Sequence, residues 1–194
     1  MTRTPKTGQT RQTLRDATME SHHVVDAIYA GFALDSVVDY RAFLIAHARA
    51  LGGLEAATGP DTPRLPLLAQ DLAALDLPVP DPLPLAHSAA DGFHWGLRYA
   101  LEGSRLGGAM LSRQVSPGLP KAYLSAAHGK GEWIAFQQAL DSAAMEGGEG
   151  WLDDAVQGAQ AAFALFAQAG RFSQVARVPS HAPNQAPNQA NGHG

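Results

Sequence analysis

The sequence predicts an all-α protein with one domain, and three observations support this class. Apolar residues recur three and four positions apart along most of the chain, which is the spacing of helices that bury one face. No segment alternates apolar and polar residues convincingly enough to predict a strand. The length of 194 residues suits a single domain with a sizeable core.

Two helices are predicted at the start of the domain. The first is expected to begin near Arg11 or Thr13 and to end near Phe32. The second is expected over about residues 37–57. Ser36 is its predicted N-cap, because a serine oxygen can accept a hydrogen bond from a backbone N–H of the first turn.

A shorter helix is predicted over about residues 65–75. An extended connector follows, because proline is incompatible with a helix interior and this segment contains Pro78, Pro80, Pro82 and Pro84. The next helix is expected over about residues 87–113. Beyond a break at Ser116-Pro-Gly118, three more helices are expected, at about 122–127, 132–145 and 151–172.

Both ends of the chain lack this periodicity. Residues 1–10 are polar and are predicted to form a flexible tail. Residues 178–194 repeat Ala-Pro-Asn-Gln without an apolar segment to anchor them, so they are predicted to be disordered. The helical domain is therefore expected to span residues 11–177.

Composition excludes several classes of function. The formal net charge is −4 and no basic stripe is present, so nothing predicts a nucleic-acid partner. The absence of cysteine excludes disulfides, thiolate metal ligands and cysteine nucleophiles. No secretory signal or membrane-length apolar run is found, so we expect a cytoplasmic protein with no membrane partner.

Three glycines stand within a predicted helix, in the segment Tyr99-Ala-Leu-Glu-Gly-Ser-Arg-Leu-Gly-Gly108. Each glycine in a helix costs about 1 kcal/mol relative to alanine, so Gly103, Gly107 and Gly108 call for an explanation. The two candidate explanations are a kink and the close approach of a large, flat group to the backbone. Tyr99, one turn before Gly103, is either a donor to a carboxylate or an ordinary half-buried tyrosine.

The first helix carries a second candidate group. His22 and Asp26 are four residues apart and share a helix face, so the carboxylate can accept a hydrogen bond from one ring nitrogen while the other binds a metal. From spacing alone, a solvated surface pair is the commoner arrangement. Arg15, two turns earlier, either reaches an anionic group of a ligand held by His22 or is solvated.

Other candidates are weaker. Glu20 and His23 form one Glu-x-x-His half of a di-iron signature, but no second half exists, so a di-iron site is not expected. Phe163 and Phe166 on the last helix are expected in the core, where one of them can line a pocket. The scattered histidines are interpreted as core or surface residues: His47, His87, His94 and His128.

The two helical segments together resemble the haem oxygenase family. The family's first-helix pattern is matched by Leu14, Arg15, Thr18, His22, Val25 and Asp26. Its distal-helix pattern, in the form found in the bacterial branch, is matched by residues 99–108, and Tyr40-Arg-Ala-Phe43 is also similar. The similarity spans about residues 12–172 and is closest to bacterial biliverdin-producing enzymes, including those associated with bacteriophytochromes.

This resemblance implies a helical bundle with haem between the first helix and a kinked distal helix. His22 would be the iron ligand, oriented by Asp26. The distal backbone at Gly103, Gly107 and Gly108 would lie against the porphyrin.

The remaining site residues follow from the same resemblance. Arg15 and Tyr99 match positions that contact haem propionates in bacterial relatives. Ser104 stands where animal enzymes have an aspartate, so we expect it beside the haem, and Phe163 is expected to line the pocket.

The implied activity is oxidative cleavage of haem to biliverdin, CO and ferrous iron, with haem as both substrate and cofactor. No flavin or nicotinamide fingerprint is present, so electrons would come from a ferredoxin or an NAD(P)H reductase. A bacteriophytochrome that takes up biliverdin is a further expected partner. The alternative is a non-catalytic haem carrier on the same fold. A thiamine-degrading relative is disfavoured, because that branch relies on a cysteine nucleophile.

Overall fold

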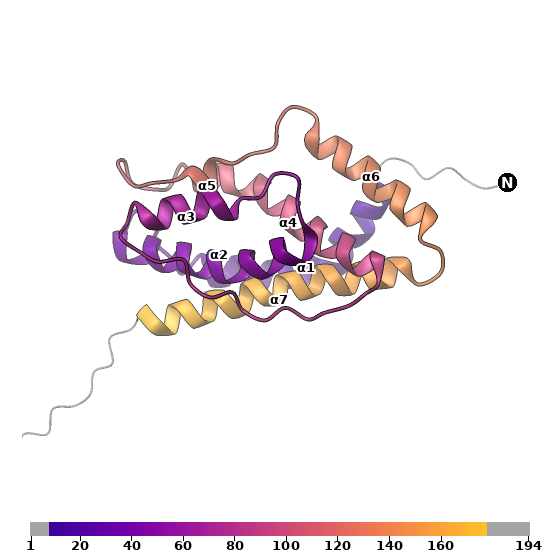
Figure 1. Ribbon diagram of the computed structural model, residues 1–194, viewed down its shortest axis with the longest axis horizontal. Coiled ribbons are helices and arrows are strands. Elements are labelled where there is room, and N and C mark those ends of the chain that lie inside the picture. The colour runs from indigo at the N-terminus through magenta and orange to yellow at the C-terminus, as the bar shows by residue number, and fades with distance from the viewer. Residues whose placement is uncertain (1–7, 178–194) are drawn as a thin grey trace, which may run out of the picture.

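The computed structural model describes residues 8–177, which form seven α-helices and no strand (Figure 1). This confirms the predicted all-α class. The helices are α1 (Gln9–Tyr29), α2 (Val37–Thr58), α3 (Leu65–Ala73), α4 (Asp91–Leu111), α5 (Ala122–Ser125), α6 (Glu132–Glu146) and α7 (Trp151–Arg177). No helix of the described part is both long and apolar enough to cross a membrane.

The helix bounds differ from the predicted ones mainly at the ends. Gln9 and Thr10 already belong to α1, so the predicted N-terminal tail is too long by these two residues. Gly8 is the N-cap of α1, and the rest of that tail, residues 1–7, lies outside the described residues, as does the predicted C-terminal tail, residues 178–194. The predicted N-cap is confirmed, since the Asp39 backbone N–H donates to the Ser36 hydroxyl at 3.4 Å.

Helix α7 is the central element. Helices α1, α2 and α4 all pack along it, and Figure 1 shows it running along the lower side of the molecule beneath them. The core between these helices is aliphatic: Leu44, Leu51, Leu97, Leu101 and Leu165 are at most 5% exposed. A fully buried leucine contributes about 1.5–3 kcal/mol relative to an exposed one, so this core dominates the stability of the bundle.

Helices α4 and α7 touch through their backbones. A Cβ atom added to Gly96 would lie 1.9 Å from the Ala155 carbonyl oxygen, and one added to Gly158 would lie 2.0 Å from that of Phe93. Real Cβ atoms do not approach an oxygen so closely, so only glycine allows this crossing. The sequence analysis did not identify Gly96 or Gly158 as contact residues. The same signal, a glycine within a predicted helix, drew attention to Gly103.

Helices α1 and α4 both start near the start of α7. Leu14 of α1, Trp95 and Tyr99 of α4 and Trp151 of α7 belong to one apolar cluster. Helix α1 then follows α7 along its length, and the Tyr29 hydroxyl donates to the Phe166 carbonyl at 3.1 Å.

Helix α4 also packs against α5 near its C-terminal end. A Cβ atom added to Gly108 would lie 3.0 Å from the Leu124 carbonyl of α5. Its helical hydrogen bonding continues through the glycine cluster without a break. Helix α5 therefore supports the second half of α4 at Gly108.

Buried carboxylates fix two short connections. Asp71 of α3 accepts hydrogen bonds of 2.9 Å from the backbone N–H groups of Ala122 and Tyr123, so it caps the start of α5. Burial raises the pKa of Asp71, and these two bonds oppose the rise. Asp141 of α6 accepts from the Thr10 N–H at 3.0 Å and ties down the start of α1. These contacts satisfy N–H groups that a helix start leaves unpaired.

His47 of α2 lies within an aromatic cluster. Its ring centroid is 4.1 Å from that of Phe43 and 4.6 Å from that of Tyr29. Its Nδ1 hydrogen-bonds to the Phe43 carbonyl oxygen at 2.9 Å. Burial lowers the pKa of His47 to about 4, which keeps the ring neutral at neutral pH and agrees with its interpretation as a core histidine.

Replacing Gly96 by alanine is predicted to lower the free energy of unfolding by about 2–3 kcal/mol or more, because the new Cβ would push α4 away from α7. Gly107→Ala is the control, since a Cβ there meets nothing within 4 Å. Alanine is the better helix former, so this control is expected to be neutral or to stabilise by up to about 1 kcal/mol. Urea unfolding followed by circular dichroism measures both, and equal effects would contradict the backbone contact.

The free energy of unfolding is predicted to fall as the pH decreases from about 6.5 to about 4. In this range the unfolded His47 takes up a proton and the folded one does not, so the unfolded state is favoured by roughly 3 kcal/mol at most. His47→Gln is expected to flatten the dependence, whereas His87→Gln, at an exposed position, is expected to retain it. Identical pH profiles for both variants would rule out His47 as the source.

Candidate functional site

Helices α1 and α4 meet at Tyr99. Its hydroxyl group lies near the side chain of Thr18 on α1, whose own hydroxyl donates to the Leu14 carbonyl at 2.7 Å. Burial raises the pKa of Tyr99, and the nearby charges of Arg11 and Arg15 oppose that rise. Arg15 and Tyr99, two predicted site residues that are 84 positions apart in the sequence, are thus near enough for the charge of one to affect the other.

His22 lies one helical turn beyond Thr18 on α1. Its Nδ1 is 2.9 Å from the Asp26 carboxylate, as the spacing predicted. A carboxylate only accepts hydrogen bonds, so this pair favours the tautomer with the proton on Nδ1, in which Nε2 keeps a lone pair for a metal. Both side chains are more than half exposed, so the pair contributes little to folding and is available to a ligand.

Phe163 of α7 supports the imidazole ring from a second direction. The centroids of the Phe163 and His22 rings are 5.6 Å apart, with the ring planes at 65° to each other. This edge-to-face geometry is favourable for aromatic pairs. Asp26 and Phe163 together limit how the His22 ring can turn.

The glycines of α4 fall on two different faces. Gly103 lies one turn beyond Tyr99 and Gly107 a further turn on, and a Cβ added to either meets nothing within 4 Å. These two leave a stretch of bare backbone that opens on free space. Gly108 packs closely against the Leu124 carbonyl of α5 instead. The structure thus shows Gly108 in contact with another helix of the protein, whereas the family resemblance implied that its backbone would lie against the porphyrin.

Ser104 faces the interior. Its hydroxyl donates to the Leu101 carbonyl at 2.6 Å and accepts from Nη2 of Arg64, also at 2.6 Å. Arg64 is 2% exposed, and its guanidinium lies over the Tyr123 ring, 5.2 Å from the centroid. Ser104 therefore couples the bare-backbone segment to a buried arginine. Sequence reasoning missed Arg64, because a cation in a predicted loop gives no sign that it is buried.

A second polar group holds the same part of α4. The Glu102 carboxylate accepts from Nε of Arg105 at 2.8 Å and pairs with Nε2 of His128 at 3.0 Å. Arg105 also donates to the Thr62 carbonyl oxygen. Both Arg105 and His128 are less than 9% exposed, so this group is enclosed between α4 and the loops on either side. Only the fold brings these residues together.

Comparison with known proteins gives one sequence relative. A haem oxygenase from Xanthomonas campestris pv. campestris (strain 8004) is 36% identical over 113 residues, covering 53% of this chain and 64% of the relative. The match thus spans less than two thirds of that relative's length. No family model matches the sequence.

Comparison of folds gives a fuller match. The crystal structure of the NO- and CO-bound haem oxygenase from Neisseria meningitidis aligns with 91% of this chain and 98% of its own, with a TM-score of 0.72 and 23% sequence identity. The two comparisons confirm the resemblance drawn from the sequence, while the association with bacteriophytochromes stays a prediction. This chain therefore has the fold of a haem oxygenase and is similar in sequence to a haem oxygenase over part of its length.

Proposed function

We propose that this chain is a haem oxygenase that binds haem between α1 and the second half of α4. The observation that supports the proposal most is the nearness of Tyr99 to Thr18, because His22 and Gly103 each lie one turn further along α1 and α4. In this proposal the metal-binding nitrogen of His22 and the bare backbone at Gly103 face the same ligand from the two helices.

The donor set fits haem. A lone histidine holds iron well when the other ligands arrive with the metal, as the four porphyrin nitrogens do. Nδ1 of His22 is committed to Asp26, which fixes the tautomer and makes Nε2 the iron ligand. Phe163 restrains the ring, so the protein presents this nitrogen in one orientation.

The residues on either side of His22 suit the propionates and the flat face of haem. Arg15 and Tyr99 offer a cation and a phenol to the propionates at the polar edge of the ring. The bare backbone at Gly103 and Gly107 accepts a flat face at close range, where any side chain would stand in the way.

The chemistry of the bare face favours ring cleavage over peroxidase-type chemistry. When bound, haem supplies the redox chemistry and is itself the substrate. Gly103 and Gly107 offer only backbone groups, so they present no acid–base side chain to the distal side of the ring. Ser104 and Gly108 act indirectly in this proposal, by holding the segment through Arg64 and α5.

The finer parts of the proposal follow from the family. The products are biliverdin, CO and ferrous iron. The electrons come from a ferredoxin or an NAD(P)H reductase, and a bacteriophytochrome is a candidate recipient of the biliverdin. The reaction is assigned to the cytoplasm.

Mixing the protein with hemin is predicted to produce a sharp Soret band, and ascorbate under air is predicted to convert that band into broad red biliverdin absorption. His22→Ala is expected to lose the axial ligand and reduce turnover at least a hundredfold, because no other histidine of α1 has both a carboxylate partner and an aromatic contact. His23→Ala is the matched control: His23 is also exposed and adjoins His22, but it makes no contact with Asp26 or Phe163.

Two outcomes would contradict this function. A stable Soret band that does not decay would indicate a haem carrier. An unchanged Soret band in His22→Ala would show that another residue holds the iron.

Gly107→Leu is predicted to weaken hemin binding by at least tenfold, because its side chain would fill the space against α4. Gly107→Ala is expected to lose much less, since it adds one carbon. Difference-absorption titration measures affinity, and circular dichroism shows that each variant is folded. Hemin affinities equal to that of the unsubstituted protein in both variants would exclude this face of α4 from the site.

A further inference from the structure

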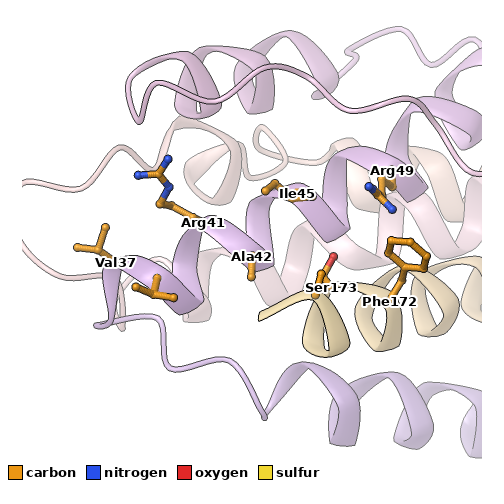
Figure 2. A pocket seen from close by; sticks show the side chains of 9 residues that line it. Val37, Arg41, Ala42, Ile45, Arg49, Phe172 and Ser173 are labelled. Atoms are coloured by element: carbon orange, nitrogen blue, oxygen red, sulfur yellow. The ribbon is translucent and has the colours of Figure 1, made fainter. Parts of the chain in front are cut away.

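A groove separates α2 from the last turns of α7 (Figure 2). Its volume is about 360 Å³, within the range of small-molecule pockets. The walls are mainly apolar and include Val37, Ala42 and Ile45 from α2 and Phe172 from α7. Val37 and Phe172 are about half exposed, so this apolar surface is open to solvent.

The groove is distinct from the proposed haem site. Phe172 follows Phe163 by nine residues on α7, which amounts to two and a half helical turns. The two side chains therefore project from opposite faces of α7, about 13 Å apart along its axis. His22 contacts Phe163, whereas the groove lies on the Phe172 side.

Two arginines give the groove a positive charge. Arg41 and Arg49 line it and form no ion pair with any carboxylate among residues 8–177. None of the described lining residues is acidic. The Arg49 guanidinium lies over the Phe172 ring, 4.5 Å from the centroid, so the cation is held against the apolar wall.

The floor of the groove contains polar atoms without partners. Ser173 lines the groove and is 5% exposed, yet its hydroxyl has no hydrogen-bond partner in the described part of the chain. Nε of Arg49 is also buried and unpaired. Buried polar groups normally have partners, so two such atoms beside one groove indicate that an acceptor is missing. Figure 2 shows Arg49, Phe172 and Ser173 gathered at one end of the groove.

We propose that this groove binds an aliphatic carboxylate. The carboxylate accepts hydrogen bonds from Arg49 and Ser173, and the hydrocarbon chain lies along Ile45 and Ala42 toward Val37. Arg41 and Arg49 are eight residues apart, about 12 Å along α2, so the first adds positive potential at the far end of the groove. A carboxylate satisfies the unpaired donors and the apolar wall together, which neither a purely apolar partner nor a small inorganic anion does.

The test is calorimetric titration of the full chain with octanoate. We expect saturable binding that weakens with added salt, and at least tenfold weaker binding of octan-1-ol, which lacks the charge. Arg49→Gln is expected to reduce octanoate affinity at least tenfold. Arg113→Gln, which removes an equal charge at an exposed position after α4, is expected to leave it unchanged.

Ser173→Ala keeps the test valid if Arg49→Gln does not fold. Removing an unpaired buried hydroxyl is not expected to lower the unfolding temperature, but it is expected to weaken octanoate binding several-fold. Amide NMR shifts caused by octanoate are expected at Ile45, Arg49 and Ser173.

Three results would overturn the proposal. The first is equal affinity for octanoate and octan-1-ol. The second is octanoate-induced shifts confined to α1 and α4. The third is sedimentation showing a dimer that Arg49→Gln dissociates and octanoate does not, which would assign the groove to a second copy of the chain.

Discussion

The backbone contact between α4 and α7 is the constraint on which the rest of the structure depends. Gly96 and Gly158 remove the two side chains that would otherwise separate these helices. The first half of α4 is thereby held against α7, beside the start of α1. In the second half of α4, Gly103 and Gly107 have open space beside them. A wider crossing would carry Tyr99 away from Thr18 and change the relation between His22 and the glycines.

A helix segment that exposes bare backbone needs support from its other faces, and buried polar groups supply it here. Arg64 binds Ser104 and the Leu101 carbonyl, while Glu102 joins Arg105 and His128. Bonds that involve a charged partner are the stronger kind, and in a buried setting they fix position as well as adding energy. The wall proposed to face haem is thus held by side chains that do not themselves lie on the open face.

Helix α7 serves the two proposed sites in different ways. Near its middle, Phe163 supports the His22 ring, and near its end Phe172 forms one wall of the groove beside Arg49. Nine residues separate the two phenylalanines, so they occupy opposite faces of the helix. Ligands at the two sites would contact the same rigid element without competing for the same surface.

The sequence by itself determined the helical class, most helix positions and the pairing of His22 with Asp26, because these depend on residues a few positions apart. The family pattern also indicated Tyr99 and the glycines. Only the tertiary structure decided that Gly108 packs on α5 whereas Gly103 and Gly107 stay open, and that Ser104 turns toward Arg64. The same holds for the close crossing at Gly96 and for the groove beside Arg49. These features join segments tens of residues apart, and the local spacing of residue types does not specify which helix faces which.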